Sequence, residues 1–195
     1  MRETMQRRPL GCGAARRLAT AIAVIAAVAA AAPAAADVGV RVGYYDGGDA
    51  DDPVPVFGVY GRVDIPGPLN FELSADYREE SLAGGALEAT VVPARVSAVL
   101  NFLPGLSPYL LAGVGADFVS IDFTGAWAGQ GDESDLALEW HAGGGFEIGL
   151  GPVSFVGDLR YCGVAEVGND AVRAALGRAY DPSGWYASVS AAISF

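Results

Sequence analysis

The sequence contains no lysine, so all 12 of its basic residues are arginine, and it contains a single histidine, His141. Cysteine is also scarce, because Cys12 and Cys162 are the only two. Between residue 37 and the last loop the chain has no long helical pattern. Without lysine, the chain lacks the residue that usually solvates exposed strands. The last absence excludes a mainly helical fold.

The first 36 residues have the features of a secretory signal. Five arginines precede an apolar run over 18–32, and the stretch APAAAD has the small residues that a signal peptidase requires. We predict a cleaved signal peptide over 1–36 and one domain over 37–195. The alternative is an N-terminal membrane anchor, for which the run is short and rich in alanine. After cleavage one cysteine remains, which excludes an intramolecular disulfide.

The charge of the mature chain is strongly negative. Removing residues 1–36 takes away five arginines and one glutamate, which leaves seven arginines, 22 acidic residues and a net charge of −15 instead of −11. Such a chain avoids nucleic acid and anionic phosphate groups unless a cation bridges them. The sequence therefore predicts no nucleic-acid partner.

Eight segments alternate apolar and polar residues with a period of two, which indicates β-strands. They cover 38–45, 54–64, 69–78, 87–101, 108–119, 135–149, 153–164 and 185–195. The connections alternate between tight turns rich in proline and glycine and four longer polar loops, 46–52, 79–86, 120–134 and 165–184. Short turns at one end and long loops at the other are typical of an outer-membrane barrel. In the last loop, DAVRAALGRAY has the pattern of two or three helical turns.

The two faces of these strands differ sharply in charge. One face is apolar and uncharged, and the other mixes glycine and serine with twelve mostly charged residues. These are Arg41, Arg62, Glu72, Asp76, Arg78, Arg95, Asp117, Glu139, His141, Glu147, Asp158 and Arg160. A soluble barrel turns its apolar face inward, whereas a charge facing lipid at mid-depth costs about 2–4 kcal/mol. The lack of lysine and the near balance of acidic and basic residues on the charged face favour a membrane barrel, in which the apolar face contacts lipid.

We therefore predict an all-β fold, an eight-stranded antiparallel up-and-down transmembrane β-barrel, with the twelve residues forming a polar network in its lumen. Eight strands leave an interior just wide enough for side chains to fill. A plug of paired charges is favoured over a conduction path, since an unpaired buried charge is costly. Arg62, Arg95 and Arg160 are each expected to contact a carboxylate.

Four segments of the chain carry a resemblance: PYLLAGVGADF, EWHAGGGFEIGL, VSFVGDLRY and the terminal ASVSAAISF. They resemble the small outer-membrane β-barrels of Gram-negative bacteria, in particular the OmpA-like and opacity-protein-like barrels of the porin superfamily. The resemblance covers 37–195 and implies location in the outer membrane, among lipid and lipopolysaccharide. In that family the assembly machinery reads the last strand, for which Phe195 supplies the terminal aromatic. Ile193 stands where a second aromatic is common.

His141 is the candidate for catalysis, because it is the one histidine and shares the charged face with Glu139 and Glu147. A hydrolase needs a serine beside the histidine and an acid behind it. The lipid A deacylase barrel has histidine and serine two residues apart, and here that position is Gly143. We therefore interpret His141 as a member of the interior network, with no catalytic residue.

The first long loop, DGGDADD, contains a cluster of carboxylates, which can bind calcium. The spacing is not that of an EF-hand, and an acidic run is usually solvated. We predict no metal and no cofactor. The weak candidates for metal binding are Asp46, Asp49, Asp51 and Asp52.

Aromatic residues near the strand ends are typical of the two interfacial girdles of a membrane barrel. The predicted girdles comprise Tyr44, Phe57, Tyr77, Phe118 and Trp185 at one rim, and Phe71, Phe102, Phe155 and Phe195 at the other. The alternative interpretation is ordinary strand propensity.

The sequence favours a monomeric, non-enzymatic barrel with a structural or surface-interaction role. Its four acidic loops would face outward, toward an extracellular ligand or the lipopolysaccharide layer. A narrow porin-like channel for small solutes and a lipid-modifying enzyme are the alternatives.

Overall fold

The computed structural model describes residues 36–102, 106–124, 133–168 and 170–194. The predicted signal peptide lies outside these segments except for Ala36, where the first strand begins. Within the described segments, no helix combines the length and the apolar character needed to cross a bilayer.

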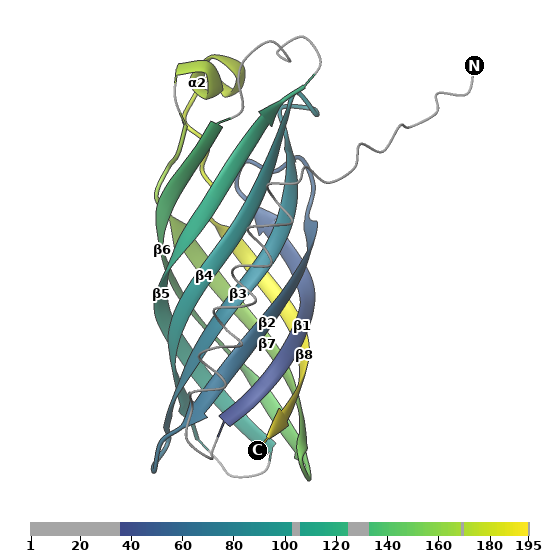
Figure 1. Ribbon diagram of the computed structural model, residues 1–195, viewed down its shortest axis with the longest axis vertical. Helices are drawn as coiled ribbons and strands as arrows, with labels where there is room; N and C mark the ends of the chain where they lie inside the picture. Colours follow the sequence, from purple (N-terminus) through teal and green to yellow (C-terminus); the bar gives the residue numbers. More distant parts are fainter. Residues whose placement is uncertain (1–35, 103–105, 125–132, 169, 195) are drawn as a thin grey trace, which may run out of the picture.

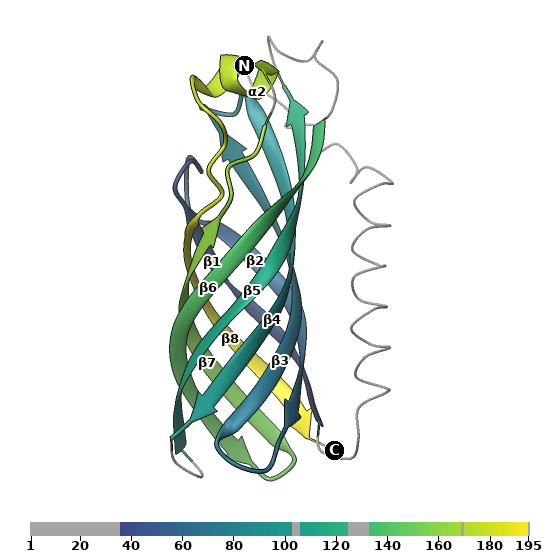
Figure 2. The ribbon, with the colours of Figure 1, turned by 90° about the vertical axis from the view of Figure 1, so that its left-hand side faces the viewer.

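The described chain forms eight strands that close into a barrel (Figures 1 and 2). The strands are β1 (Ala36–Gly47), β2 (Val54–Asp64), β3 (Leu69–Leu82), β4 (Leu87–Asn101), β5 (Leu106–Phe123), β6 (Glu133–Leu150), β7 (Val153–Val164) and β8 (Gly184–Ser194). Each strand pairs antiparallel with the next, and β1 pairs with β8 from Asp37 opposite Ser194 to Gly47 opposite Gly184. This ladder leaves no free edge. The predicted eight-stranded antiparallel barrel is confirmed.

The middle of the barrel has its apolar side chains on the outside. Val40, Val114 and Leu138 are 62%, 64% and 73% exposed. In the same part of these strands the charged residues Arg41, Asp117 and Glu139 point inward and are buried. This is the reverse of a barrel in water and agrees with the faces predicted from the alternation.

Four strands are longer than the alternation indicates. The first, β1, is predicted over 38–45 and covers Ala36–Gly47. β3 continues to Leu82, and β5 and β6 have 18 residues each. In the added lengths of β3 and β5 apolar side chains turn inward: Leu82 and Ile121 are buried inside, next to the buried Glu80, while Glu79 is exposed. At the end of the barrel where Leu82 and Ile121 lie, apolar side chains therefore face the interior, as they do in a barrel in water.

The connection between β3 and β4 is shorter than predicted. Residues 79–82 belong to β3, so that only 83–86 form the turn. Ala83, Gly84 and Gly85 have φ angles of 53°, 65° and 81°, a region that glycine adopts without strain. The long loop predicted over 79–86 is thus a tight turn.

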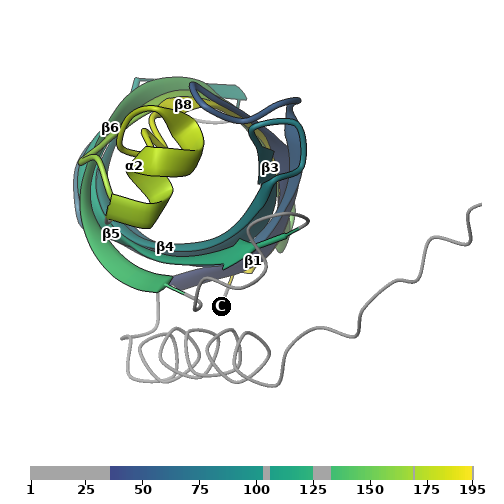
Figure 3. The same ribbon diagram turned by 90° about the horizontal axis from the view of Figure 1, so that it is seen from above.

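The helical pattern in the last loop is confirmed as α2 (Asp170–Leu176). Asp170 lies in its first turn, where a negative charge is favourable. Val172 is fully buried and packs into the barrel end. Seen from above, α2 lies over one side of the opening of the ring of strands (Figure 3). We call the end of the barrel that α2 covers the α2 end. The opposite end, which has the short connections at 65–68 and 151–152, is the turn end.

Candidate functional site

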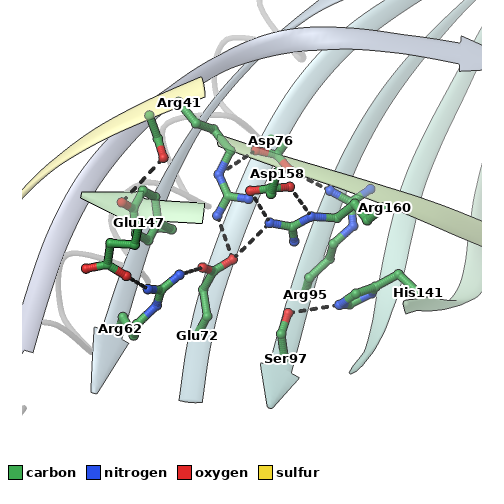
Figure 4. A network of polar contacts seen from close by, with 12 residues as sticks. Arg41, Arg62, Glu72, Asp76, Arg95, Ser97, His141, Glu147, Asp158 and Arg160 are labelled. Carbon is green, nitrogen blue, oxygen red and sulfur yellow. Dashed lines mark hydrogen bonds and ion pairs between the residues drawn. The ribbon is translucent and has the colours of Figure 1, made fainter. Parts of the chain in front are cut away.

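The twelve polar residues assigned to the lumen all lie on the inward face of the barrel. Ten of them are buried, and Glu147 and Asp158 are partly buried. Figure 4 shows most of them as one network of ion pairs that links strands on different sides of the barrel. The lumen is therefore filled by paired charges.

Glu72, on β3, is the centre of this network. Its carboxylate oxygens accept hydrogen bonds from Arg41 at 2.9 Å, Arg62 at 3.1 Å and Arg160 at 3.4 Å (Figure 4). The side chains of all four residues are at most 3% exposed. Each arginine also has a second carboxylate: Asp76 for Arg41 at 3.6 Å, Glu147 for Arg62 at 2.5 Å and Asp158 for Arg160 at 2.8 Å.

Arg95, on β4, joins two further carboxylates. Its Nη1 lies 2.5 Å from Asp76, and its Nε and Nη2 lie 2.5 and 2.9 Å from the two oxygens of Glu139. This bidentate geometry is the strong form of an arginine–carboxylate pair. Together with the contacts of Arg62 and Arg160, every arginine singled out from the sequence thus contacts a carboxylate.

A third group of charges lies toward the α2 end. Arg78 contacts Glu80 at 2.5 Å and Asp117 at 3.5 Å, and its guanidinium lies 3.9 Å from the ring centre of Tyr45. Tyr180, from the segment that follows α2, donates its hydroxyl to Glu80 at 2.6 Å. Burial, together with the Glu80 carboxylate, raises the pKa of the Tyr180 hydroxyl well above its ordinary value. The hydroxyl therefore remains a donor at neutral pH.

His141 has a serine partner that sequence reasoning missed. Its Nε2 lies 2.8 Å from the hydroxyl of Ser97 (Figure 4), and its Nδ1 lies 3.0 Å from Glu139. Ser97 and His141 are on β4 and β6, and Gly113 of β5 lies between them in register. A side chain at Gly113 would meet the imidazole, since its Cβ would be 2.6 Å from Nε2. Gly113 could have indicated the contact between Ser97 and His141, but only if the register of the three strands had been known.

A serine, a histidine and a carboxylate in this order have the geometry of an activated nucleophile. Ser97 and His141 are, however, each only 1% exposed. Glu139 is also held by Arg95. A cavity opens at the turn end of the described chain, lined by Asp37, Arg62 and Glu147 among others, and its lining does not include Ser97, His141 or Glu139. The contacts agree with the interpretation of His141 as part of the interior network.

An apolar cluster fills the barrel at the α2 end. It includes Leu82, Leu87, Val91, Val119, Ile121, Val172 and Tyr180. The segment between β7 and β8 is fixed over it by hydrogen bonds from Tyr45 to the Pro182 carbonyl at 2.5 Å and from the Gly48 amide to Ser183 at 2.8 Å. This end of the lumen is therefore closed by apolar side chains.

The four aspartates of the first long loop do not gather around a common point. Asp49 pairs with Arg178, and Asp51 accepts hydrogen bonds from the amides of Gly84 at 3.1 Å and Gly85 at 3.2 Å. Asp46 and Asp52 are exposed. Among the described residues, no group of three or more histidine, cysteine or acidic side chains is arranged to hold a metal ion. Asp49 thus ties the first long loop to the segment between β7 and β8, and Asp51 ties it to the turn between β3 and β4.

Seven of the nine predicted girdle residues lie on the outside of the barrel, among them Phe57, while Phe102 lines the cavity at the turn end and Phe195 lies outside the described residues. The exposed fractions are 65% for Tyr44, 49% for Phe118, 53% for Trp185, 41% for Phe71 and 50% for Phe155, and Tyr77 is partly buried. Trp185 also contacts the ring of Tyr161 at 5.3 Å between centroids, and Tyr161 contacts Trp140 at 5.7 Å. Of the predicted assembly signal, Ile193 faces outward, and Phe195 lies outside the described residues.

Comparison with known proteins gives one family and several similar structures. The sequence model of a family described as outer membrane protein beta-barrel domain matches residues 18–192. Comparison with curated proteins found no match.

Three solved structures share the architecture. Neisserial surface protein A has 14% identity and a TM-score of 0.66, and the match covers 82% of this chain and 97% of that one. A major outer membrane protein of Thermus thermophilus has 16% identity and a TM-score of 0.57, covering 82% and 99%. The N-terminal β-barrel domain of Pseudomonas aeruginosa OprF has 12% identity and a TM-score of 0.50, covering 82% and 97%. At such identities the likeness concerns the fold alone.

Proposed function

Because the chain belongs to the outer membrane protein β-barrel domain family, we propose that it is a non-enzymatic barrel that acts through an acidic outer end, in envelope structure or cell-surface interactions. The family is one of Gram-negative outer-membrane proteins, so the apolar belt of the barrel faces lipid. By the usual sidedness, the α2 end faces outward and the turn end faces the periplasm.

The distribution of arginine carries this proposal. Five of the seven arginines after residue 36 are buried in the lumen: Arg41, Arg62, Arg78, Arg95 and Arg160. The other two, Arg173 and Arg178, are at the α2 end. That end also has many acidic residues, among them Asp46, Asp49, Asp51, Asp52, Glu79, Glu88, Asp122, Asp135, Glu166, Asp170 and Asp181. The charge that a partner would meet outside is therefore strongly negative.

The filled lumen argues against the alternative of a narrow channel. Between the turn end and α2, a solute would have to displace the paired charges around Glu72 and Arg95 and then the apolar cluster. Each displaced pair would leave a buried charge without a partner. The enzyme alternative has the hydrogen bonds of Ser97 and His141 in its favour and their burial against it.

We expect the purified barrel to show no steady conductance steps in planar lipid bilayers, because ion pairs and the apolar cluster of the described residues fill the lumen. Heat-modifiable gel migration of the same preparation serves as the control that the barrel is folded. Reproducible single-channel steps from the folded form would contradict the proposed role and favour the channel.

Association with lipopolysaccharide should depend on divalent cations, because an acidic outer end repels lipid phosphates unless a cation bridges them. We expect bound lipopolysaccharide to fall to the background level when EDTA is added to the folded barrel in nanodiscs, as measured by gel or mass spectrometry. A Glu88→Lys/Asp52→Lys variant has a less negative outer end, and it should retain more lipopolysaccharide in EDTA than the unaltered protein does. Equal retention by the unaltered protein with and without EDTA would refute the bridging role.

A further inference from the structure

A cavity of about 570 Å³ opens at the turn end, away from the proposed outer surface. Its wall includes the inward residues at the turn-end positions of β1 and β2, Asp37 and Asp64, and Glu147 of β6. Phe102 and Ile65 form its apolar part and are 52% and 43% exposed. A volume of this size is in the range of small-molecule sites, about 300–1,000 Å³.

The charges of this cavity are not balanced. Among the described residues of its lining, Arg62 is the one cation, against the three carboxylates. Its guanidinium is already bonded to Glu72 at 3.1 Å and to Glu147 at 2.5 Å. In the described chain, neither Asp37 nor Asp64 has an ion pair within 4 Å, although the Asp37 residue is only 8% exposed. The cavity thus differs from the lumen around Glu72, where every carboxylate faces an arginine.

Two neutral acceptors in the same wall point to a ligand that donates hydrogen bonds. The hydroxyl of Ser107 and the side-chain carbonyl of Asn101 both line the cavity and have no hydrogen-bond partner within the described chain. Ser107 is 9% exposed, and buried polar groups are normally satisfied. A ligand with several N–H groups would complement both these oxygens and the carboxylates.

We propose that this cavity binds a small organic cation with a primary ammonium group. The carboxylates of Asp37 and Asp64 neutralise the charge, Ser107 and Asn101 accept further N–H bonds, and Phe102 covers the methylene chain. A bare metal ion fits less well, because the cavity is larger than an ion needs. The described residues also hold no group of three or more acidic, histidine or cysteine side chains arranged for a metal.

The sequence supplies its own reporters for a test. After residue 36 it has four side-chain amides, two that line the cavity, Asn70 and Asn101, and two elsewhere in the sequence, Gln130 and Asn169. The folded barrel in nanodiscs is titrated with cadaverine. It carries a short Gly-Ser extension before Asp37, which moves the α-amino group of the chain away from the cavity. We expect the amide NMR signals of Asn70 and Asn101 to shift and the other two to stay in place. Pentanediol, the neutral analogue, should shift none.

An Asp37→Asn/Asp64→Asn variant should bind cadaverine about tenfold more weakly or worse, which corresponds to about 1.4 kcal/mol. The matched control is Asp52→Asn/Glu88→Gln, which removes the same charge at the outer end and should leave the affinity unchanged. An Asp64→Asn single variant serves if the double variant fails to fold. The proposal is overturned if cadaverine shifts neither reporter, if both double variants weaken binding equally, or if magnesium chloride shifts the reporters as strongly as cadaverine.

Discussion

We expect the Glu72→Gln variant to lose about 3–5 kcal/mol of unfolding free energy, the usual cost of breaking a buried ion pair from one side. Glu72 is the shared acceptor of Arg41, Arg62 and Arg160, and all four side chains are at most 3% exposed. Glutamine keeps the shape and one acceptor oxygen but leaves three guanidinium groups short of negative charge. The loss is measured by urea unfolding of the barrel in lipid vesicles, with the fluorescence of the outward Trp140 and Trp185 as the signal.

Glu88→Gln is the matched control, because it makes the same chemical change on the exposed outer end. Its unfolding free energy should stay within about 0.5 kcal/mol of the unaltered protein. If Glu72→Gln unfolds within that same margin, the network around Glu72 does not stabilise the barrel and the assignment of its contacts is wrong.

The inward and outward faces of the barrel could be predicted because they depend only on parity along each strand. A residue two positions from an inward residue is again inward, whatever its neighbour strand does. For this reason Arg62, Arg95 and Arg160 were correctly assigned to the interior from local sequence alone. Strand number followed from the same alternation and from the turn residues between the segments.

The partners inside the lumen required the register, which local sequence does not determine. Ser97 and His141 meet because both stand opposite Gly113, and this follows from two hydrogen-bonded ladders and not from either strand. Parity likewise could not choose Glu72 over Asp76 as the centre of the network. These choices depend on how far each strand is shifted against the next.

The ends of β3 and β5 were missed for another reason. The strands were predicted from alternation of apolar and polar residues along one continuous apolar face, and near Leu82 and Ile121 the apolar residues lie on the other, inward face. The period of two continues through this change, while the face that is apolar changes side. In an outer-membrane barrel such a change marks where a strand leaves lipid for water. The inversion is thus a sequence signal for the membrane boundary.

Trypsin should cut the folded barrel only in the segment between β7 and β8. Trypsin cleaves after lysine or arginine, and the chain after residue 36 has no lysine and seven arginines. Five of these are buried in the lumen, while Arg173 and Arg178 are exposed. A buried strand residue becomes accessible only when the ladder opens, which costs a large part of the global unfolding free energy. On a denaturing gel, intact cells treated with trypsin should show one large fragment that ends at Arg173 or Arg178.

An Arg173→Gln/Arg178→Gln variant should resist trypsin while folded, since no exposed cleavage site remains. Heat-denatured protein of either form should be cut at the lumen arginines as well, because unfolding exposes them. If trypsin instead cuts the folded barrel at Arg62 or Arg95, those residues do not lie in a closed lumen. If the segment is cut only in broken cells, the α2 end faces the periplasm and the acidic end has no access to the cell surface.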